Sequence, residues 1–296
     1  MDASPEAAAD DATPRSSFSR VELALIGALV VVWIPGILQL ASIWSSVEYA
    51  SHGFLVPLVA LWAATAHRVE LSGLEPRPMP GGRLLLGSMA GLYLLALAMR
   101  DPTFLGLVAV ATVAALVLAL RGAAWVRRLQ FSLGFLLFMV PLPSAWVTPV
   151  IVWLQLLVSN AAVAILRESG VAIFREGNVL VLPGDVSLFV AEACSGITSL
   201  VTLLPIGVFI AYFTESVTWR RFVLVLTVIP VALAGNLLRV ILTVILSTEV
   251  SVEYATEGPL HDWAGVATYL VGCLVLLGVG ALMRRWIPER ESGTVR

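Results

Sequence analysis

The chain lacks lysine and has few charges of either sign. All 18 basic residues in its 296 residues are arginine, 13% of the chain is charged and 59% is hydrophobic. With a mean hydropathy of +0.93, a soluble domain could not cover its surface with polar groups. The net charge of −2 gives no bulk attraction to nucleic acid. The composition therefore predicts an integral membrane protein without a nucleic-acid partner.

Cysteine is also scarce. Cys194 and Cys273 are the only two, which is too few for a disulfide framework or a zinc site. The sequence contains no GxSxG motif, no HExxH motif and no paired intramembrane aspartates. These absences argue against acyltransferases and intramembrane proteases built on those motifs. We expect no metal and no cofactor.

Long apolar runs are abundant, and they favour one helical bundle over soluble domains. Residues 1–20 are polar and predict a disordered cytoplasmic tail, and residues 287–296 predict a second cytoplasmic tail. The run after Arg20 is too long for a signal-peptide core and predicts a retained first span. We predict an all-α polytopic membrane bundle that forms one domain over 21–286. The eight predicted spans are 22–44, 53–66, 84–99, 103–120, 129–146, 196–213, 222–247 and 264–283.

The arginines predict how these spans are oriented. Of the 18 arginines, 14 lie before the first span, between spans two and three, four and five, and six and seven, and after the last span. The positive-inside rule places all these segments in the cytoplasm. The loops 45–52 and 248–263 contain no arginine and are predicted to lie outside. We expect both termini in the cytoplasm of a bacterium, with the chain in the plasma (inner) membrane.

A ninth apolar run, 149–166, is interrupted by Gln155, Ser159 and Asn160 at helical spacing. All the arginine-containing segments named above fall on the cytoplasmic side only if this run does not cross the membrane. We therefore predict an outer interfacial helix within an outer stretch, 147–195. Short alternating segments in that stretch predict a hairpin before Cys194.

Three polar residues distant in sequence are predicted to meet at the outer face. Cys194 lies at the outer start of the sixth span, and His261 lies in the last outer loop. Arg239 follows Arg221 by 18 residues, which is about 27 Å along a helix and close to the full thickness of the hydrocarbon core. The sequence alone does not show that the three side chains touch.

The chemistry of these residues is mutually compatible. A cysteine attacks as the thiolate, which a helix N-terminus stabilises. Histidine moves protons near neutral pH, and arginine holds a carbonyl, a carboxylate or a developing oxyanion. Glu192 opposes the thiolate unless it turns away or orients His261.

Structural roles are the alternatives for each residue. A lone cysteine in a membrane helix is commonly a small filler, which is the interpretation we adopt for Cys273. A lone loop histidine is commonly solvated, and Arg239 could extend to the headgroups. A charge within a span is costly, however, and usually functional. Asn236, Arg239 and Thr243 share a helix face, which favours a position facing the bundle.

Three blocks, in this order, carry a resemblance to a known family. They are EACSGI at 192–197, NLLR at 236–239 and HDWAG at 261–265, preceded by an earlier SHG block at 51–53. Together they resemble the signature blocks of the exosortase/archaeosortase family, over roughly residues 45–283. The resemblance implies catalytic roles for Cys194, Arg239 and His261 and supporting roles for His52, Glu192 and Asn236; for His52, helix-end capping or packing is the alternative.

The resemblance also implies a substrate and a reaction. The expected substrates are exported proteins that end in a short motif such as Pro-Glu-Pro, a transmembrane helix and an arginine-rich tail. Cys194 would form a thioacyl intermediate, which an amine, a hydroxyl or water resolves, and membrane lipid is an expected partner. The alternative is a transporter or an assembly protein for exopolysaccharide export without catalysis. The near absence of mid-span charges and of repeated halves argues against a transporter.

Overall fold

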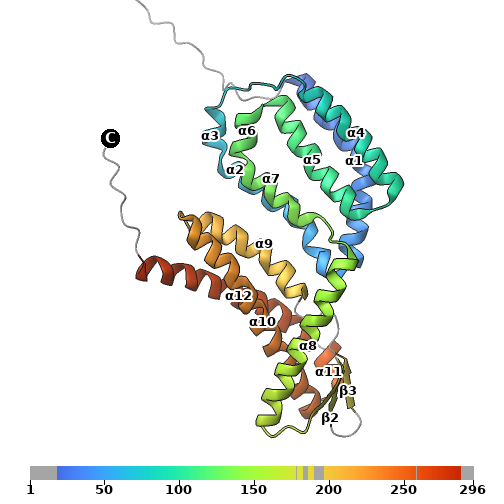
Figure 1. Ribbon diagram of the computed structural model, residues 1–296, viewed down its shortest axis with the longest axis vertical. Coiled ribbons are helices and arrows are strands. Elements are labelled where there is room, and N and C mark those ends of the chain that lie inside the picture. Colours follow the sequence, from blue (N-terminus) through green and yellow to red (C-terminus); the bar gives the residue numbers. More distant parts are fainter. Residues whose placement is uncertain (1–18, 178, 183–185, 190–196, 258, 288–296) are drawn as a thin grey trace, which may run out of the picture. The chain divides into compact units, whose positions relative to one another are not determined.

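The structure is a computed structural model that describes residues 19–177, 179–182, 186–189, 197–257 and 259–287. For residues 186–189, 197, 257 and 259–262 it describes the backbone alone. Within these ranges the chain has 12 α-helices, two 3₁₀ helices and one three-stranded sheet (Figure 1). The predicted all-α polytopic bundle is confirmed.

The elements follow one another with short connections. The α-helices are α1 (Arg20–Ser46), α2 (Val56–Ala66), α3 (Arg68–Ser72), α4 (Gly82–Met99), α5 (Pro102–Leu120), α6 (Ala123–Arg128), α7 (Gln130–Phe135), α8 (Ser144–Glu168), α9 (Ile197–Thr214), α10 (Thr218–Glu249), α11 (Val252–Glu257) and α12 (Pro259–Trp286). The 3₁₀ helices are η1 (Glu48–Phe54) and η2 (Leu136–Met139), and the strands are β1 (Phe174–Glu176), β2 (Val179–Leu182) and β3 (Val186–Phe189).

The chain divides into two compact units. The first contains Met1–Trp44 and Gly53–Pro141, and the second contains Ser45–His52 and Leu142–Arg296. The prediction that 21–286 acts as one membrane domain stays a prediction.

In the first unit, polar contacts show which helix ends lie together. At one end, Arg121 after α5 forms an ion pair of 3.2 Å with Glu22 in the first turn of α1. At the other end, Trp44 Nε1 donates to the carbonyl of Met139 at 3.0 Å, and the Thr103 hydroxyl donates to the carbonyl of Pro141 at 2.6 Å. Helix α1 therefore begins at the end where α5 stops, as the predicted alternation of spans requires.

Close packing of Trp44 explains a glycine in the early SHG block. A Cβ on Gly53 would overlap the indole ring of Trp44. Phe54 meets the same indole ring edge-on, with the ring centroids 5.2 Å apart. Only glycine fits at position 53 without moving the tryptophan.

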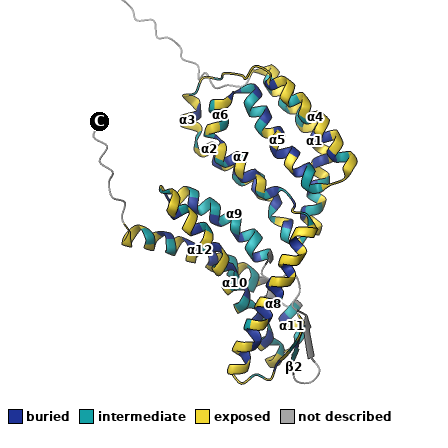
Figure 2. Ribbon diagram, viewed as in Figure 1, coloured by how far each residue is buried: buried dark blue, intermediate teal, exposed yellow. Residues whose placement is uncertain are grey.

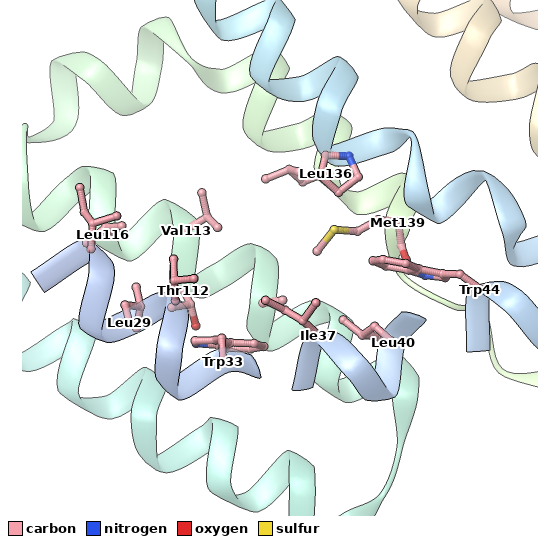
Figure 3. Close-up of a pocket in the computed structure, with 14 residues that line it drawn as sticks. Leu29, Trp33, Ile37, Leu40, Trp44, Thr112, Val113, Leu116, Leu136 and Met139 are labelled. Carbon is pink, nitrogen blue, oxygen red and sulfur yellow. The ribbon is translucent and has the colours of Figure 1, made fainter. Parts of the chain in front are cut away.

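An apolar cavity of about 380 Å³ also lies in this unit (Figure 3). Side chains of α1, α5 and η2 line it, among them Trp33, Ile37, Thr112, Leu136 and Met139. The Thr112 hydroxyl is satisfied by the Val108 carbonyl at 2.7 Å. The described lining therefore offers little beyond apolar contact.

In the second unit, α10 is the central helix. It packs beside α8, α9, α11 and α12 (Figure 1). Core residues in its first half pack against Leu203 of α9 and Leu276 of α12, and core residues in its second half pack against α8 and the sheet. Every fourth residue of α10 is buried, which gives a ridge formed by Arg220, Leu224, Val228, Ala232, Asn236, Val240 and Val244.

The predicted hairpin is present as part of a three-stranded antiparallel sheet in the order β1-β2-β3. Val179 pairs with Phe189, and Leu182 pairs with Val186. The buried side chains of Leu180 and Leu182 pack on the second half of α8. The sequence did not predict the third strand, β1.

Seven helices in the described residues are long and apolar enough to cross a membrane, and α7–η2 and α9 are shorter apolar helices. Six of the eight predicted spans correspond to long helices, and the span at 196–213 corresponds to α9. The fifth predicted span, 129–146, is wrong as one continuous helix, because its helix ends at Met139. Pro141 and Pro143 follow directly, and neither can donate a helical backbone hydrogen bond.

Helix α8 is itself one of the seven by length and composition, so its assignment as an interfacial helix stays a prediction. The first turns of α8 meet Val201 near the start of α9 and Leu233 midway along α10, and its later turns meet Val240 and Val244. Helix α8 therefore runs beside the second half of α10.

Large apolar side chains dominate the exposed positions of the long helices (Figure 2). Leu84 is 80% exposed and Leu274 is 67% exposed. Such surfaces are stable in contact with lipid chains, where water is absent. The chain is an integral membrane protein.

Cysteine accessibility tests the predicted orientation. In a variant without Cys194 and Cys273, single cysteines placed in 175–185 and 255–261 should react with an impermeant maleimide from outside. Cysteines placed in 68–83 and 214–221 should react only after the membrane is opened. Cytoplasmic labelling of 175–185 would mean that α8 crosses the membrane.

Candidate functional site

Helices α10 and α12 pack antiparallel with a register that three contacts define. A Cβ on Gly272 would lie 3.6 Å from Val231, and one on Gly235 would lie 2.6 Å from Thr268. A Cβ on Gly265 would lie 3.8 Å from Nη2 of Arg239. The guanidinium of Arg239 therefore lies against the α12 backbone at a position without a side chain.

Helix α9 starts at the same height as Arg239 along the axis of α10. Gly207 of α9 contacts Val228 of α10, and Ile197, the first residue of α9, lies ten residues before Gly207. Ten residues span about 15 Å of helix in each of the two antiparallel helices. The N-terminus of α9 is therefore level with residue 238 of α10, next to Arg239.

The first turn of α12 supplies position 261. The helix begins at Pro259, so His261 belongs to its first turn and lies one helical turn before Gly265. The expectation that 248–263 forms a loop is wrong in part, because α11 and the start of α12 occupy most of it. Proline is well suited to the first helical position, since its fixed φ is already helical and it lacks an N–H that would need a partner.

Arg239 and Asn236 lie about 60° apart around the axis of α10. Asn236 is fully buried on the four-residue ridge, whereas Arg239 is partly buried and turned toward α12. The Thr243 hydroxyl donates to the carbonyl of Arg239 at 2.9 Å. The shared face predicted for these three residues is therefore bundle-facing, although only Asn236 is completely enclosed.

Cys194 and Glu192 lie outside the described residues. The structure brings together Arg239, Gly265 and the start of α9, and it gives no position for the thiol. The side chain of His261 is likewise not described. The roles predicted for Cys194, Glu192 and His261 stay predictions.

His52 belongs to the unit that contains Arg239. The short helix η1 is held there by Tyr49, which packs on the cluster of Val147, Ile151 and Leu154. His52 lies three residues later and is partly buried. This placement is compatible with its predicted supporting role and with a role in packing.

A groove of about 460 Å³ separates the exposed sides of α10 and α12. We call it the α10/α12 groove. Arg239 is the only charged residue among the described residues that line it. Its lining provides no metal ligands, and no group of three or more His, Cys, Asp or Glu in the described part of the chain could hold a metal ion.

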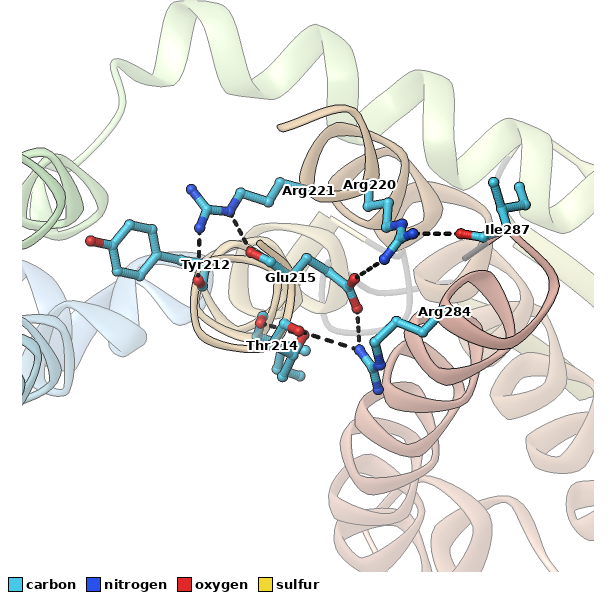
Figure 4. Close-up of polar contacts among 8 residues, drawn as sticks. Tyr212, Thr214, Glu215, Arg220, Arg221, Arg284 and Ile287 are labelled. Atoms are coloured by element: carbon cyan, nitrogen blue, oxygen red, sulfur yellow. Dashed lines mark hydrogen bonds and ion pairs between the residues drawn. The ribbon is translucent and has the colours of Figure 1, made fainter. Parts of the chain in front are cut away.

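A buried ion cluster that sequence reasoning missed lies at the opposite end of the same helices (Figure 4). The carboxylate of Glu215, between α9 and α10, is fully buried and pairs with Arg284 of α12. Arg220 lies 3.9 Å from its second oxygen and donates to the carbonyl of Ile287. Arg221 donates to the carbonyl of Glu215 at 2.7 Å. A lone acidic residue in an arginine-flanked loop was the available sequence signal.

This cluster fixes the register of α9, α10 and α12 along their axes. It ties the α9–α10 turn to the last turns of α12, about 27 Å along α10 from Arg239. Because all three helices continue to the opposite end, their alignment there depends on this contact. The position of Glu215 therefore sets the relative heights, along the helix axes, of Ile197, Arg239 and Gly265.

A separate cluster in the first unit surrounds His67. Arg128 Nη2 lies 3.2 Å from His67 Nδ1, and Glu70 lies 3.7 Å from the same atom. Burial and the charge of Arg128 lower the pKa of His67 below its ordinary value. The imidazole is therefore neutral at pH 7 and accepts a hydrogen bond from Arg128, which is a structural role.

Comparison with known families gives a match over most of the chain. The family described as transmembrane exosortase (Exosortase_EpsH) matches residues 44–278. The chain belongs to the transmembrane exosortase family. The matched region of this exosortase contains His52, Cys194, Arg239 and His261. Searches of curated proteins and of solved structures give no match.

Removing the buried carboxylate should destabilise this exosortase. Glu215→Gln leaves Arg220 buried without its charge partner, and breaking a buried pair costs about 3–5 kcal/mol. We expect a clearly lower midpoint of thermal unfolding in detergent. Glu249→Gln, at the exposed end of α10, is the control and should unfold like the wild type. Equal midpoints for both variants would show that the cluster does not hold the helices together.

Proposed function

We propose that the protein is a membrane-embedded cysteine transpeptidase or protease that cleaves the C-terminal sorting signal of exported proteins. It would act at the outer face of the bacterial inner membrane. Its substrates would end in a short motif, an apolar helix and an arginine-rich tail. Membership of the exosortase family supports this proposal, together with the position of Arg239 described above.

The observation that carries the proposal is that segments of α9, α10 and α12 lie at the same height along the helix axes. Arg239 of α10 lies against Gly265 of α12, at the level where α9 begins. Cys194 precedes Ile197 by three residues, which is at most about 11 Å of chain. Position 261 lies one turn, about 6 Å, before Gly265. These covalent distances allow the three proposed catalytic groups to reach one substrate bond.

Cys194 would be the nucleophile. Its thiolate attacks the scissile carbonyl carbon, and the start of α9 favours the anion. The tetrahedral intermediate collapses with cleavage of the C–N bond, while His261 gives a proton to the departing amine. The products of this half-reaction are a thioester on Cys194 and the released C-terminal tail.

An acceptor would complete the reaction. Neutral His261 takes a proton from an amine, a hydroxyl or water, and the acceptor oxygen or nitrogen attacks the thioester. Collapse of the second intermediate releases the thiolate of Cys194. An amine or hydroxyl acceptor gives transpeptidation or esterification, and water gives hydrolysis.

Arg239 would stabilise the negative oxygen of both intermediates or hold the substrate carbonyl. Its planar guanidinium offers several donors, and in a site of low dielectric each contact is stronger than in water. Gly265 leaves room for it against the α12 backbone. Asn236, buried one turn closer to the cytoplasm, would support the helix face that carries Arg239.

Tail cleavage in membranes tests these roles. Cys194→Ala should abolish processing, and Cys194→Ser should be nearly as severe, since a hydroxyl is far less ionised than a thiol at neutral pH. Arg239→Lys should fail because an ammonium group does not reproduce the planar guanidinium. His261→Ala should slow cleavage by about 10²–10⁴-fold.

Cys273→Ala is the matched control for the cysteine variants. It lies in the middle of α12 and packs with Leu203 and Leu276, so processing should stay at the wild-type rate. Each variant is compared at equal protein level by immunoblot. Normal cleavage by Cys194→Ala would end the cysteine mechanism, and cleavage that persists without the protein would leave a transporter or assembly role for this family member.

A further inference from the structure

The α10/α12 groove runs inward from the proposed catalytic level. Its outer part contains Arg239 and Ala264, and its inner end lies at Pro230 and Val275. From Arg239 to Pro230 is nine residues, or about 13.5 Å of helix. The groove therefore begins at the proposed site and continues into the hydrocarbon core of the membrane.

The walls of the groove combine small residues with an open side. Small side chains or glycines line it at Ala234, Gly235, Ala264, Ala267 and Gly272. Its apolar edges are accessible, since Leu238 is 58% exposed and Val271 is 57% exposed. Small residues at such a position allow another helix backbone to approach closely within a membrane.

The described lining of the groove contains two polar side chains, those of Thr268 and Arg239. The Thr268 hydroxyl is satisfied within its own helix, by the carbonyl of Ala264 at 2.8 Å. Arg239 is the remaining charged group in the described lining. An arginine guanidinium has five N–H donors, so it can bind a peptide carbonyl or carboxylate in addition to its contacts within the chain. The occupant that fits is apolar along its length and carries an oxygen acceptor at its outer end.

We propose that the α10/α12 groove binds the apolar helix of the substrate tail, with the peptide segment before that helix at Arg239. This inference rests on the proposed function. The bound helix would run parallel to α12, from the outer face inward, and its first nine or so residues would fill the groove. The groove would hold the scissile bond at a fixed height and would thereby select substrates by the helix that follows the cleavage motif.

Disulfide trapping tests the proposed binding site directly. The chain has only two cysteines, so a Cys194→Ala, Cys273→Ala variant is free of thiols and leaves the substrate uncleaved. Into it we would place Ala267→Cys, inside the groove, or Leu270→Cys, which is also on α12 but outside the groove and whose parent leucine is 62% exposed. The probe is an exported reporter that ends in Pro-Glu-Pro, about 20 apolar residues and an arginine cluster, with single cysteines along its helix.

Crosslinking at position 267 should exceed that at position 270 by at least about tenfold, because a disulfide requires Cα atoms within about 7 Å. Moving the groove cysteine from 267 to 271 should move the best reporter position four residues toward the cytoplasm. A shift in the opposite direction would overturn the proposed orientation. Equal crosslinking at 267 and 270 would overturn the site, and absent crosslinking with phospholipid retained on the purified protein would make the groove a lipid site.

A groove-filling variant gives a second, catalytic readout. Ala267→Phe in the otherwise native chain should lower kcat/KM for the reporter by about tenfold or more. It should leave kcat/KM unchanged for a soluble peptide that has the motif and no apolar helix. Ala281→Phe, at an exposed site of α12 outside the groove, should cleave both at wild-type rates. Equal losses on both substrates would overturn the groove proposal.

The two proposals fail separately. If the wild type does not cleave the reporter, the proposed function fails, and the crosslinking of the cysteine-free variant still decides whether the groove binds the helix. If the wild type cleaves the reporter and the crosslinks show no preference for the groove, the function stands and the binding site is wrong.

Discussion

The buried carboxylate of Glu215 sets the alignment on which the rest of the second unit depends. Two guanidinium groups, from Arg220 and Arg284, reach it from different helices. Apolar ridges alone leave long membrane helices able to slide by a turn, since one apolar contact in lipid is much like another. A fully buried charge has no such freedom, because moving its partners away exposes the full cost of desolvation. The polar contact at one end therefore fixes the geometry of the other end.

The sequence predicted the elements that depend on composition and on regular spacing. Apolar runs located six of the long helices, and the constant rise of a helix predicted how far Arg239 lies along α10 from Arg221. Alternation of Val179 to Leu182 predicted a strand, and its partner strand followed from the turn residues between them. These predictions need only local pattern and the thickness of a bilayer.

The sequence did not predict features that depend on tertiary contact. Pro141 and Pro143 divide a run that composition alone treats as continuous, and α12 begins earlier than its apolar stretch suggests. Glu215 gave little local sign that three arginines would gather around it. Of the candidate site, the position of Arg239 along α10 was predictable, whereas its contact with Gly265, 26 residues later in the sequence, depends on the register between α10 and α12. The places of Cys194 and of the His261 side chain depend on segments outside the described residues.

The buried ridge of α10 has a further geometric consequence. A residue every fourth position advances by about 400° around a helix of 3.6 residues per turn, so each step turns the ridge by about 40°. Over the six steps from Arg220 to Val244, the ridge winds through about 240°. One helix thus shows one side to α9 and α12 in its first half and a different side to α8 and the sheet in its second half. A single residue inserted between Ala232 and Asn236 would rotate the second half by about 100°. It would turn Arg239 away from α12 while the ion cluster at the other end stayed intact.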